Sequence, residues 1–280
     1  MGALRFAKYE GLGNDFLVVD ADDETVVPSE LASALCDRRR GVGGDGVLLV
    51  LPATSVGAVA RMRVVNADGS VPEMCGNGLR CVALHVARTR PSVPARFVID
   101  TDAGPKTCEM SELTSDRATV RVDMGIVSVV GSRDLTVDGR VFSLTLADAG
   151  NPHAITTQPF ERADVDRFGP PLATHASFPA GTNVEFVDLV SPTSANVVVY
   201  ERGVGITLAC GTGACATARA LVAAGRMPAE TELTVTLLGG PLFIRVENDG
   251  RVFMRGPTRL TFEGSLDTRA YPTTERTSNG

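Results

Sequence analysis

Short segments of alternating or continuous apolar residues cover most of the chain, while helical periodicity is confined to a few places. Two strands are expected first, at residues 5–9 and 16–20, with the turn signal Gly11-Leu12-Gly13-Asn14-Asp15 between them. Further strands are expected at 47–51, 62–65, 97–100, 107–110, 119–123, 141–147, 154–157, 183–189, 197–200, 233–238, 242–246 and 252–255. This pattern predicts a protein built mainly from sheet.

Four helical segments interrupt the strands. One is expected from Ser29 to Arg40 and one short turn at 164–168. The other two each begin with a cysteine and two glycines, and they run from Cys75 to Arg88 and from Cys210 to Gly225. Glycines at a helix start let backbone N–H groups approach a ligand closely, and the helix start favours an anion.

The two cysteine segments belong to an internal repeat. Cys75 and Cys210 lie 135 residues apart, and a polar residue, Asn66 or Glu201, stands nine positions before each. Two further pairs keep an offset of 137: Gly13-Asn14 with Gly150-Asn151, and Gly44-Asp45-Gly46 with Gly181-Thr182-Asn183. Four anchors in one order indicate a duplication. We therefore expect two halves, 1–124 and 125–264, and a polar tail, 265–280, without ordered structure.

Composition narrows the class of protein. The chain has 280 residues, of which 44% are hydrophobic and 21% charged, as is usual for a globular protein of two domains. Its net charge of −6 makes nucleic acid an unexpected partner. No apolar N-terminal run or membrane-length segment occurs, so we expect a cytoplasmic protein without membrane contact and with reduced cysteines.

A metal site is not expected, and residues 41–46 are not interpreted as a nucleotide site. The cysteine spacings do not match those of zinc ligands, and Cys36, Cys81, Cys108 and Cys215 have apolar neighbours typical of small buried residues. Residues 41–46 match a dinucleotide fingerprint, but they follow a helix and precede a strand, which is the reverse of the required order.

Cys75 and Cys210 are candidate acid–base groups. The field at a helix start lowers the pKa of a thiol and makes it a usable base. If the halves face each other, two thiols on opposite sides of one carbon can remove a proton and return one to the far side, which inverts a stereocentre. The backbone at Gly76-Asn77 and Gly211-Thr212 could hold a carboxylate on that carbon, and no cofactor is required.

Several motifs together resemble the diaminopimelate epimerase family, over roughly residues 4–264. They are Gly11-Leu12-Gly13-Asn14-Asp15-Phe16, Asn66-Ala67-Asp68-Gly69-Ser70, Cys75-Gly76-Asn77-Gly78, Gly150-Asn151-Pro152-His153, Glu201-Arg202-Gly203 and Ala209-Cys210-Gly211-Thr212-Gly213. The resemblance implies a cofactor-independent isomerase that interconverts LL- and meso-diaminopimelate and forms a homodimer. It also implies an α+β fold of two pseudo-symmetric domains, each a curved, mostly antiparallel sheet around a central helix, with the active site in the cleft between them.

The same resemblance assigns roles to individual residues. Cys75 and Cys210 would be the two acid–base thiols, tuned by His153 and Glu201. Gly76, Asn77, Gly211 and Thr212 would bind the carboxylate at the reacting centre, and Asn14, Asn66, Asn151, Asn183, Glu201 and Arg202 would hold the rest of the substrate. Arginine offers paired donors to a carboxylate, whereas carboxylate and amide oxygens suit an ammonium group. His85 and His175 are interpreted as structural.

One position departs from the family pattern, and three other functions remain open. Some members carry an amide side chain where this chain has Gly46. The protein could be a racemase of another amino acid with the same two thiols. It could bind a nucleotide at Gly211-x-Gly213-x-x-Ala216, with Glu230 following. It could also bind an amino acid without catalysis, which would leave two thiols without a purpose.

Overall fold

The computed structural model describes residues 3–271, which form two compact units. The first unit takes in residues up to Val120 together with those from Pro257 onward, and the second runs from Arg121 to Gly256. The expected boundary after residue 124 is therefore four residues late. The segment 257–264 was also assigned to the wrong half, because the last long strand carries the chain back into the first unit.

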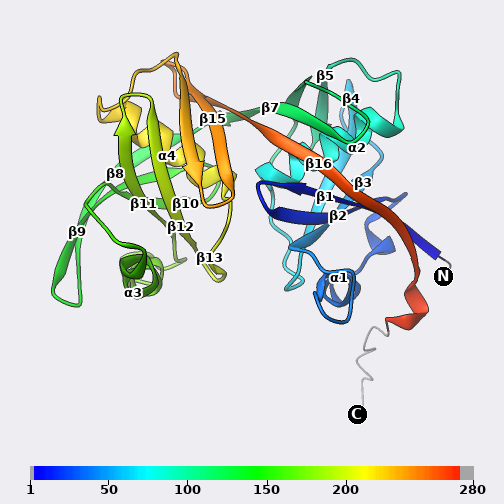
Figure 1. The fold of residues 1–280 in the computed structure, drawn as a ribbon, viewed down its shortest axis with the longest axis horizontal. Helices are drawn as coiled ribbons and strands as arrows, with labels where there is room; N and C mark the ends of the chain where they lie inside the picture. The colour runs from blue at the N-terminus through cyan, green and yellow to red at the C-terminus, as the bar shows by residue number, and fades with distance from the viewer. Residues whose placement is uncertain (1–2, 272–280) are drawn as a thin grey trace, which may run out of the picture. The chain divides into compact units, whose positions relative to one another are not determined.

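The first unit is a ring of strands around one helix (Figure 1). Neighbouring strands follow the order β1 (Ala3–Gly11), β2 (Asn14–Asp20), β3 (Gly46–Leu51), β4 (Ala58–Asn66), β5 (Arg96–Asp100), β6 (Lys106–Ser111), β7 (Arg117–Ile126) and β16 (Arg251–Asp267). The ring closes because β16 also pairs with β1. Inside it, α2 (Gly76–Thr89) packs on β1 to β4 and β6, and its residues from Gly76 to Val86 are buried.

Strand β3 is buried on both faces, which explains its uninterrupted apolar sequence. Leu48 contacts the start of α2, while Val47, Leu49 and Leu51 join the core beneath α1 (Ser29–Cys36). A strand covered by helices on both sides needs apolar residues at every position rather than at alternate ones. Helix α1 ends at Cys36 rather than at Arg40, and Pro28, not Ser29, occupies its N-cap position. A short 3-10 turn, η1 (Glu24–Val26), precedes it.

The second unit repeats this plan with its own central helix (Figure 1). The strand order is β16, β15 (Gly240–Val246), β14 (Glu232–Leu237), β12 (Ser194–Glu201), β11 (Asn183–Ser191), β10 (Pro152–Thr156), β9 (Arg140–Asp148) and β8 (Ser128–Val137), with the short β13 (Gly205–Ile206) beside β12. Helix α4 (Gly211–Ala223) packs on strands β8 to β11, β14 and β15. Helix α3 (Arg162–Ala173) covers the other side and is longer than the expected turn at 164–168.

Strand register confirms the duplication. β2 and β3 are parallel and pair Phe16 with Gly46, and β10 and β11 are parallel and pair His153 with Asn183. The neighbouring strand pairs correspond as well. β1–β2 and β9–β10 are both antiparallel, and so are β5–β6 and β14–β15. The predicted α+β fold of two similar halves, each with a mostly antiparallel sheet around a central helix, is thus correct.

The expected polar tail is partly ordered, and the prediction is wrong for residues 265–271. Residues up to Asp267 continue β16, and the 3-10 turn η2 (Thr268–Ala270) follows. Leu266 and Tyr271 pack against the core beneath α1, and the backbone of residues 265–267 pairs with β1, so this stretch belongs to the first unit. The rest of the predicted tail, residues 272–280, lies outside the described residues.

We expect Leu266→Ala to lower the free energy of unfolding by about 1–2 kcal/mol, because Leu266 is a partly buried side chain on that core. Ser265→Ala, which alters the neighbouring exposed position on the opposite face of the strand, should leave stability nearly unchanged. Urea unfolding followed by circular dichroism measures both variants. Equal stability of Leu266→Ala and the wild-type protein would contradict the packing of β16.

Candidate active site

Cys75 and Cys210 occupy the same position on equivalent helices. Each is the N-cap residue, with φ and ψ of −137° and 109° for Cys75 and −125° and 105° for Cys210. Each sulfur accepts a hydrogen bond from the third helical residue, over 3.3 Å from the N–H of Gly78 and 3.4 Å from that of Gly213. The duplication has therefore placed a thiol at the start of both central helices.

Both helix starts suit an anion. The first N–H groups of an α-helix lack intrahelical acceptors and point outward from its end. Gly76 and Asn77 hold these positions on α2, and Gly211 and Thr212 hold them on α4. The Thr212 hydroxyl also lies 3.5 Å from the Cys210 sulfur.

In the first unit, two predicted site residues join through polar contacts. The Asn77 side chain on α2 donates to the Asn14 carbonyl over 3.2 Å, and the Asn14 amide nitrogen donates to Asp45. Asp45 in turn accepts from the exposed Arg38 over 2.8 Å. Asp45 and Arg38 were not predicted as site residues, although Asp45 lies within a repeated motif. Their role is to hold the Asn14 amide in one orientation.

Asn66 ends β4 directly opposite Gly46 on β3. Its side-chain amide donates to the Ser70 hydroxyl over 3.0 Å, which fixes the turn after the strand. A Cβ atom at Gly46 would lie 2.8 Å from the Val65 carbonyl oxygen, closer than side chains pack. The backbone as it stands therefore leaves no space for a side chain at the one position that departs from the family pattern.

In the second unit, the predicted residues gather around Cys210. The Glu201 carboxyl lies close to the Cys210 thiol and accepts a hydrogen bond from the Thr207 hydroxyl over 2.5 Å. Asn183 accepts from the backbone N–H of Arg202 over 2.9 Å. The Arg202 guanidinium is exposed and donates to the Ala180 carbonyl, so the Asn183 side chain fixes the backbone from which Arg202 reaches out.

His153 pairs with Glu185, whose carboxyl group lies beside the Cys210 thiol. Its Nδ1 lies 2.6 Å from Glu185 Oε1, and its Nε2 lies 2.9 Å from the Asn151 carbonyl oxygen. Glu185 is completely buried and was not among the predicted site residues. Its signal in the sequence is a lone carboxylate inside an otherwise apolar strand start, Asn183 to Val187.

The protonation of Cys210 differs from what its place at a helix start predicts. Burial raises the pKa of this thiol well above its ordinary value, and the nearby carboxyl groups of Glu201 and Glu185 raise it further. The contacts from Thr212 and the Gly213 N–H lower it, but by less. The expectation of a lowered pKa is therefore wrong for Cys210, because desolvation and two acidic neighbours outweigh the helix start. At neutral pH this thiol holds its proton.

The other four cysteines are buried, as predicted, and the other two histidines bond to groups outside the predicted site residues. All six cysteines are thiols, and Cys36, Cys81, Cys108 and Cys215 are buried. Burial raises the pKa of Cys36 to about 11 and those of Cys81 and Cys108 to about 12. His85 lies between Tyr9 and Asp20, and His175 accepts the Ser177 N–H in the loop after α3.

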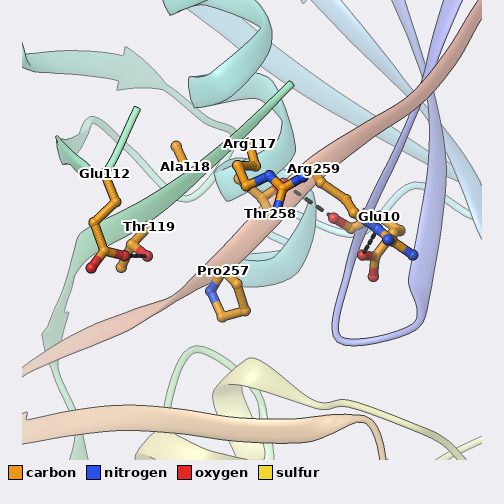
Figure 2. A pocket seen from close by; sticks show the side chains of 8 residues that line it. All are labelled: Glu10, Glu112, Arg117, Ala118, Thr119, Pro257, Thr258 and Arg259. Carbon is orange, nitrogen blue, oxygen red and sulfur yellow. Dashed lines mark hydrogen bonds and ion pairs between the residues drawn. The ribbon is translucent and has the colours of Figure 1, made fainter. Parts of the chain in front are cut away.

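A hollow of about 300 Å³ on the first unit contains none of the predicted site residues. Figure 2 shows its lining, from β1, β7, β16 and the turn after β6, in which Glu10 pairs with Arg259 and Thr119 donates to Glu112. The part of the chain described here has no cluster of three or more side chains placed to hold a metal ion. Among residues 3–271, no helix has both the length and the apolar character needed to cross a membrane.

The fold is that of a class of epimerases and racemases. A hydroxyproline epimerase from Agrobacterium vitis superposes with a TM-score of 0.74 at 16% identity, over 95% of this chain and 94% of that one. A probable proline racemase from Agrobacterium radiobacter gives a TM-score of 0.69 at 16% identity, over 94% and 91%.

Sequence similarity then defines the family. The profile described as "Diaminopimelate epimerase" matches residues 6–130 and 145–261. The diaminopimelate epimerase of Desulfitobacterium hafniense is 44% identical over 94% of this chain and 98% of its own length. The diaminopimelate epimerase of Synechococcus elongatus is 41% identical over 96% of this chain and 100% of its own length. The chain belongs to the diaminopimelate epimerase family, and the expected resemblance is confirmed.

The raised pKa of Cys210 can be tested by alkylation. Glu201→Gln removes a negative charge beside the sulfur, so we expect iodoacetamide to modify Cys210 with a pH midpoint below that of the wild-type protein. Peptide mass mapping at each pH follows Cys210 by itself. Glu247→Gln, at a surface ion pair with Arg245 in the same unit, should leave the midpoint unchanged. A midpoint unmoved in Glu201→Gln would exclude Glu201 as a neighbour that controls the thiol.

Proposed function

We propose that this protein interconverts LL- and meso-diaminopimelate without a cofactor, with Cys75 and Cys210 as its two acid–base groups. The observation that carries the proposal is the matched N-cap position of the two thiols, in a chain that belongs to the diaminopimelate epimerase family. The reaction requires both thiols to act on one carbon, one removing its hydrogen and the other supplying a proton to the opposite face.

The raised pKa of Cys210 indicates which thiol carries the proton at the start of the reaction. Because this thiol is protonated at neutral pH, it acts as the proton donor in one direction while Cys75, as the thiolate, takes the proton from the substrate. After turnover Cys210 is the thiolate and Cys75 is the thiol, and that form accepts the other stereoisomer. The two directions therefore begin from two protonation states of the same enzyme.

The helix starts would stabilise the transition state. Removal of the hydrogen pushes negative charge from the carbon onto its carboxylate. The first-turn N–H groups of Gly76, Asn77, Gly211 and Thr212 are fixed donors that can meet this charge without reorganising. This stabilisation replaces the electron sink that a cofactor would otherwise supply.

The remaining polar residues would bind the distal amino and carboxylate groups of the substrate. Arg202 carries paired donors for the far carboxylate, and the oxygens of Asn14, Asn66, Asn183 and Glu201 suit the ammonium group. Asn151, held by His153, would complete the binding. We further propose that the enzyme works as a cytoplasmic homodimer in lysine and peptidoglycan precursor synthesis, as the family resemblance implies.

Replacing either Cys75 or Cys210 by Ala should lower epimerisation by roughly a thousandfold or more, since each thiol performs a proton transfer. In D₂O the wild-type enzyme should place deuterium on the inverted product from either stereoisomer, measured by NMR and chiral chromatography. Cys36→Ala, a buried thiol with only a structural role, should remain active. Substantial epimerisation by either active-site variant would exclude the two-thiol mechanism.

Arg202→Lys keeps the charge but loses the paired donors, and we expect kcat/KM for diaminopimelate to fall about tenfold or more. Arg162→Lys, at an exposed ion pair on α3, is the matched control and should show wild-type kinetics. Turnover of a panel of amino acids by the wild-type enzyme completes the test. A racemase of another amino acid would prefer a substrate with one amino-acid group and would tolerate Arg202→Lys.

A further inference from the structure

Glu185 and His153 form a buried pair beside the second thiol. Glu185 is 0% exposed and His153 is 1% exposed, and their side chains meet at 2.6 Å. Glu185 lies on β11 two positions after Asn183, and His153 lies on the neighbouring parallel strand β10 directly beside Asn183. Two titratable groups are thus enclosed at the start of the strands that carry the substrate-binding amides.

The first unit has apolar side chains in the equivalent places. Phe16 pairs with Gly46 as His153 pairs with Asn183, so Phe16 corresponds to His153. Leu48 follows Gly46 by two positions, as Glu185 follows Asn183, so it corresponds to Glu185. The fold can therefore form with a phenylalanine and a leucine at these two positions. Packing alone does not explain why the second unit has a histidine and a glutamate there.

The glycine at the third position of each central helix confirms this equivalence. A Cβ atom on Gly78 would lie 3.0 Å from a Leu48 methyl and 3.4 Å from the Cys75 sulfur. A Cβ atom on Gly213 would lie 2.8 Å from Glu185 Oε1 and 3.2 Å from the Cys210 sulfur. The Glu185 carboxyl thus borders Cys210 from the same direction as the Leu48 side chain borders Cys75.

The hydrogen bonds of His153 determine where its protons are. Asn151 presents its carbonyl oxygen to Nε2, so this ring nitrogen must donate. Nδ1 faces Glu185 Oε1, and one proton is left for these two atoms to share. Burial raises the pKa of Glu185, and the charge of His153 opposes that change. The 2.6 Å contact places this shared proton between the Glu185 oxygen and the His153 nitrogen.

We propose that Glu185 is a positioning residue which, by sharing a proton with His153 Nδ1, forces Nε2 to donate to Asn151 and so fixes which edge of the Asn151 amide meets the substrate. With the carbonyl held by Nε2, Asn151 offers its NH₂ group, a donor suited to a carboxylate. Without Glu185 the neutral ring can donate from Nδ1 instead, and the Asn151 amide can then turn. The proposal rests on the proposed function only for the identity of the substrate.

The protonation of His153 can be observed without substrate. The chain has three histidines, so ¹⁵N-labelled imidazoles give few and separable NMR signals. In the wild-type protein we expect a protonated Nε2 and a far-downfield proton on Nδ1 of His153, and we expect both Glu185→Gln and Glu185→Leu to abolish the downfield signal. Asp20→Asn is the matched control. Asp20 pairs with His85 at a distance of 2.9 Å, and this pair does not include either thiol. This variant should change only the His85 signals.

Kinetics then separate a positioning role from a structural one. We expect Glu185→Gln and Glu185→Leu to raise KM for diaminopimelate roughly 10- to 100-fold, while Asp20→Asn keeps wild-type kinetics. Glu185→Leu installs the residue that the first unit carries at this place, so thermal unfolding should show a folded protein. In an Asn151→Ala background, Glu185→Gln should cause no further rise in KM, because Glu185 acts through Asn151.

Three results would overturn the proposal. They are a downfield His153 proton that survives in Glu185→Gln, unchanged KM in both folded Glu185 variants, and an undiminished effect of Glu185→Gln in the Asn151→Ala background. A wild-type protein that is inactive on diaminopimelate yet shows the expected NMR signals would instead refute the proposed function, and it would leave the proton-sharing pair in place.

Discussion

The hydrogen bond from the third helical N–H to a cysteine sulfur is the constraint that fixes the position of the thiol in each half. An N-cap is ordinarily an oxygen of Ser, Thr, Asp or Asn, which is a stronger acceptor. Cysteine is a weak acceptor and so contributes little to helix stability, but the position holds the sulfur at the helix start. Glycine is required at the donor, because a side chain on Gly78 or Gly213 would touch the sulfur and a strand residue together. The surrounding sheet buries the helix and keeps this arrangement rigid.

Much of the fold could be predicted from the sequence because the duplication repeats its glycine signals at a constant offset. Strand β8 was missed, since only Leu135 and Val137 at its far end are buried and its first residues are exposed. The stretch after residue 264 was misassigned for a similar reason. Between residues 265 and 271, Leu266 and Tyr271 are the apolar side chains that pack on the core, too few to produce a recognisable period. Periodicity reports burial, so strands with little burial escape it.

The candidate site was predictable where a motif is local and unpredictable where tertiary contacts decide. The two thiols and their glycines are contiguous in sequence, and the structure places them equivalently. The protonation of Cys210 is different, because the effect of a helix start is overcome by burial and by carboxyl groups from two other strands. Glu185 could not be singled out either. Its partner His153 lies 32 residues away, on a strand whose parallel register only the fold reveals.

The two halves differ in the polar groups that surround their thiols. In the proposed two-thiol reaction one thiol starts as the acid and the other as the base, and the roles exchange with the direction of the reaction. The first unit has Phe16, Leu48 and Asn66 at places where the second has His153, Glu185 and Glu201. Burial raises the pKa of the Cys210 thiol, and the carboxyl groups of Glu201 and Glu185 raise it further. The duplication supplies matched geometry for the two thiols, and the substitutions place two acidic neighbours beside Cys210.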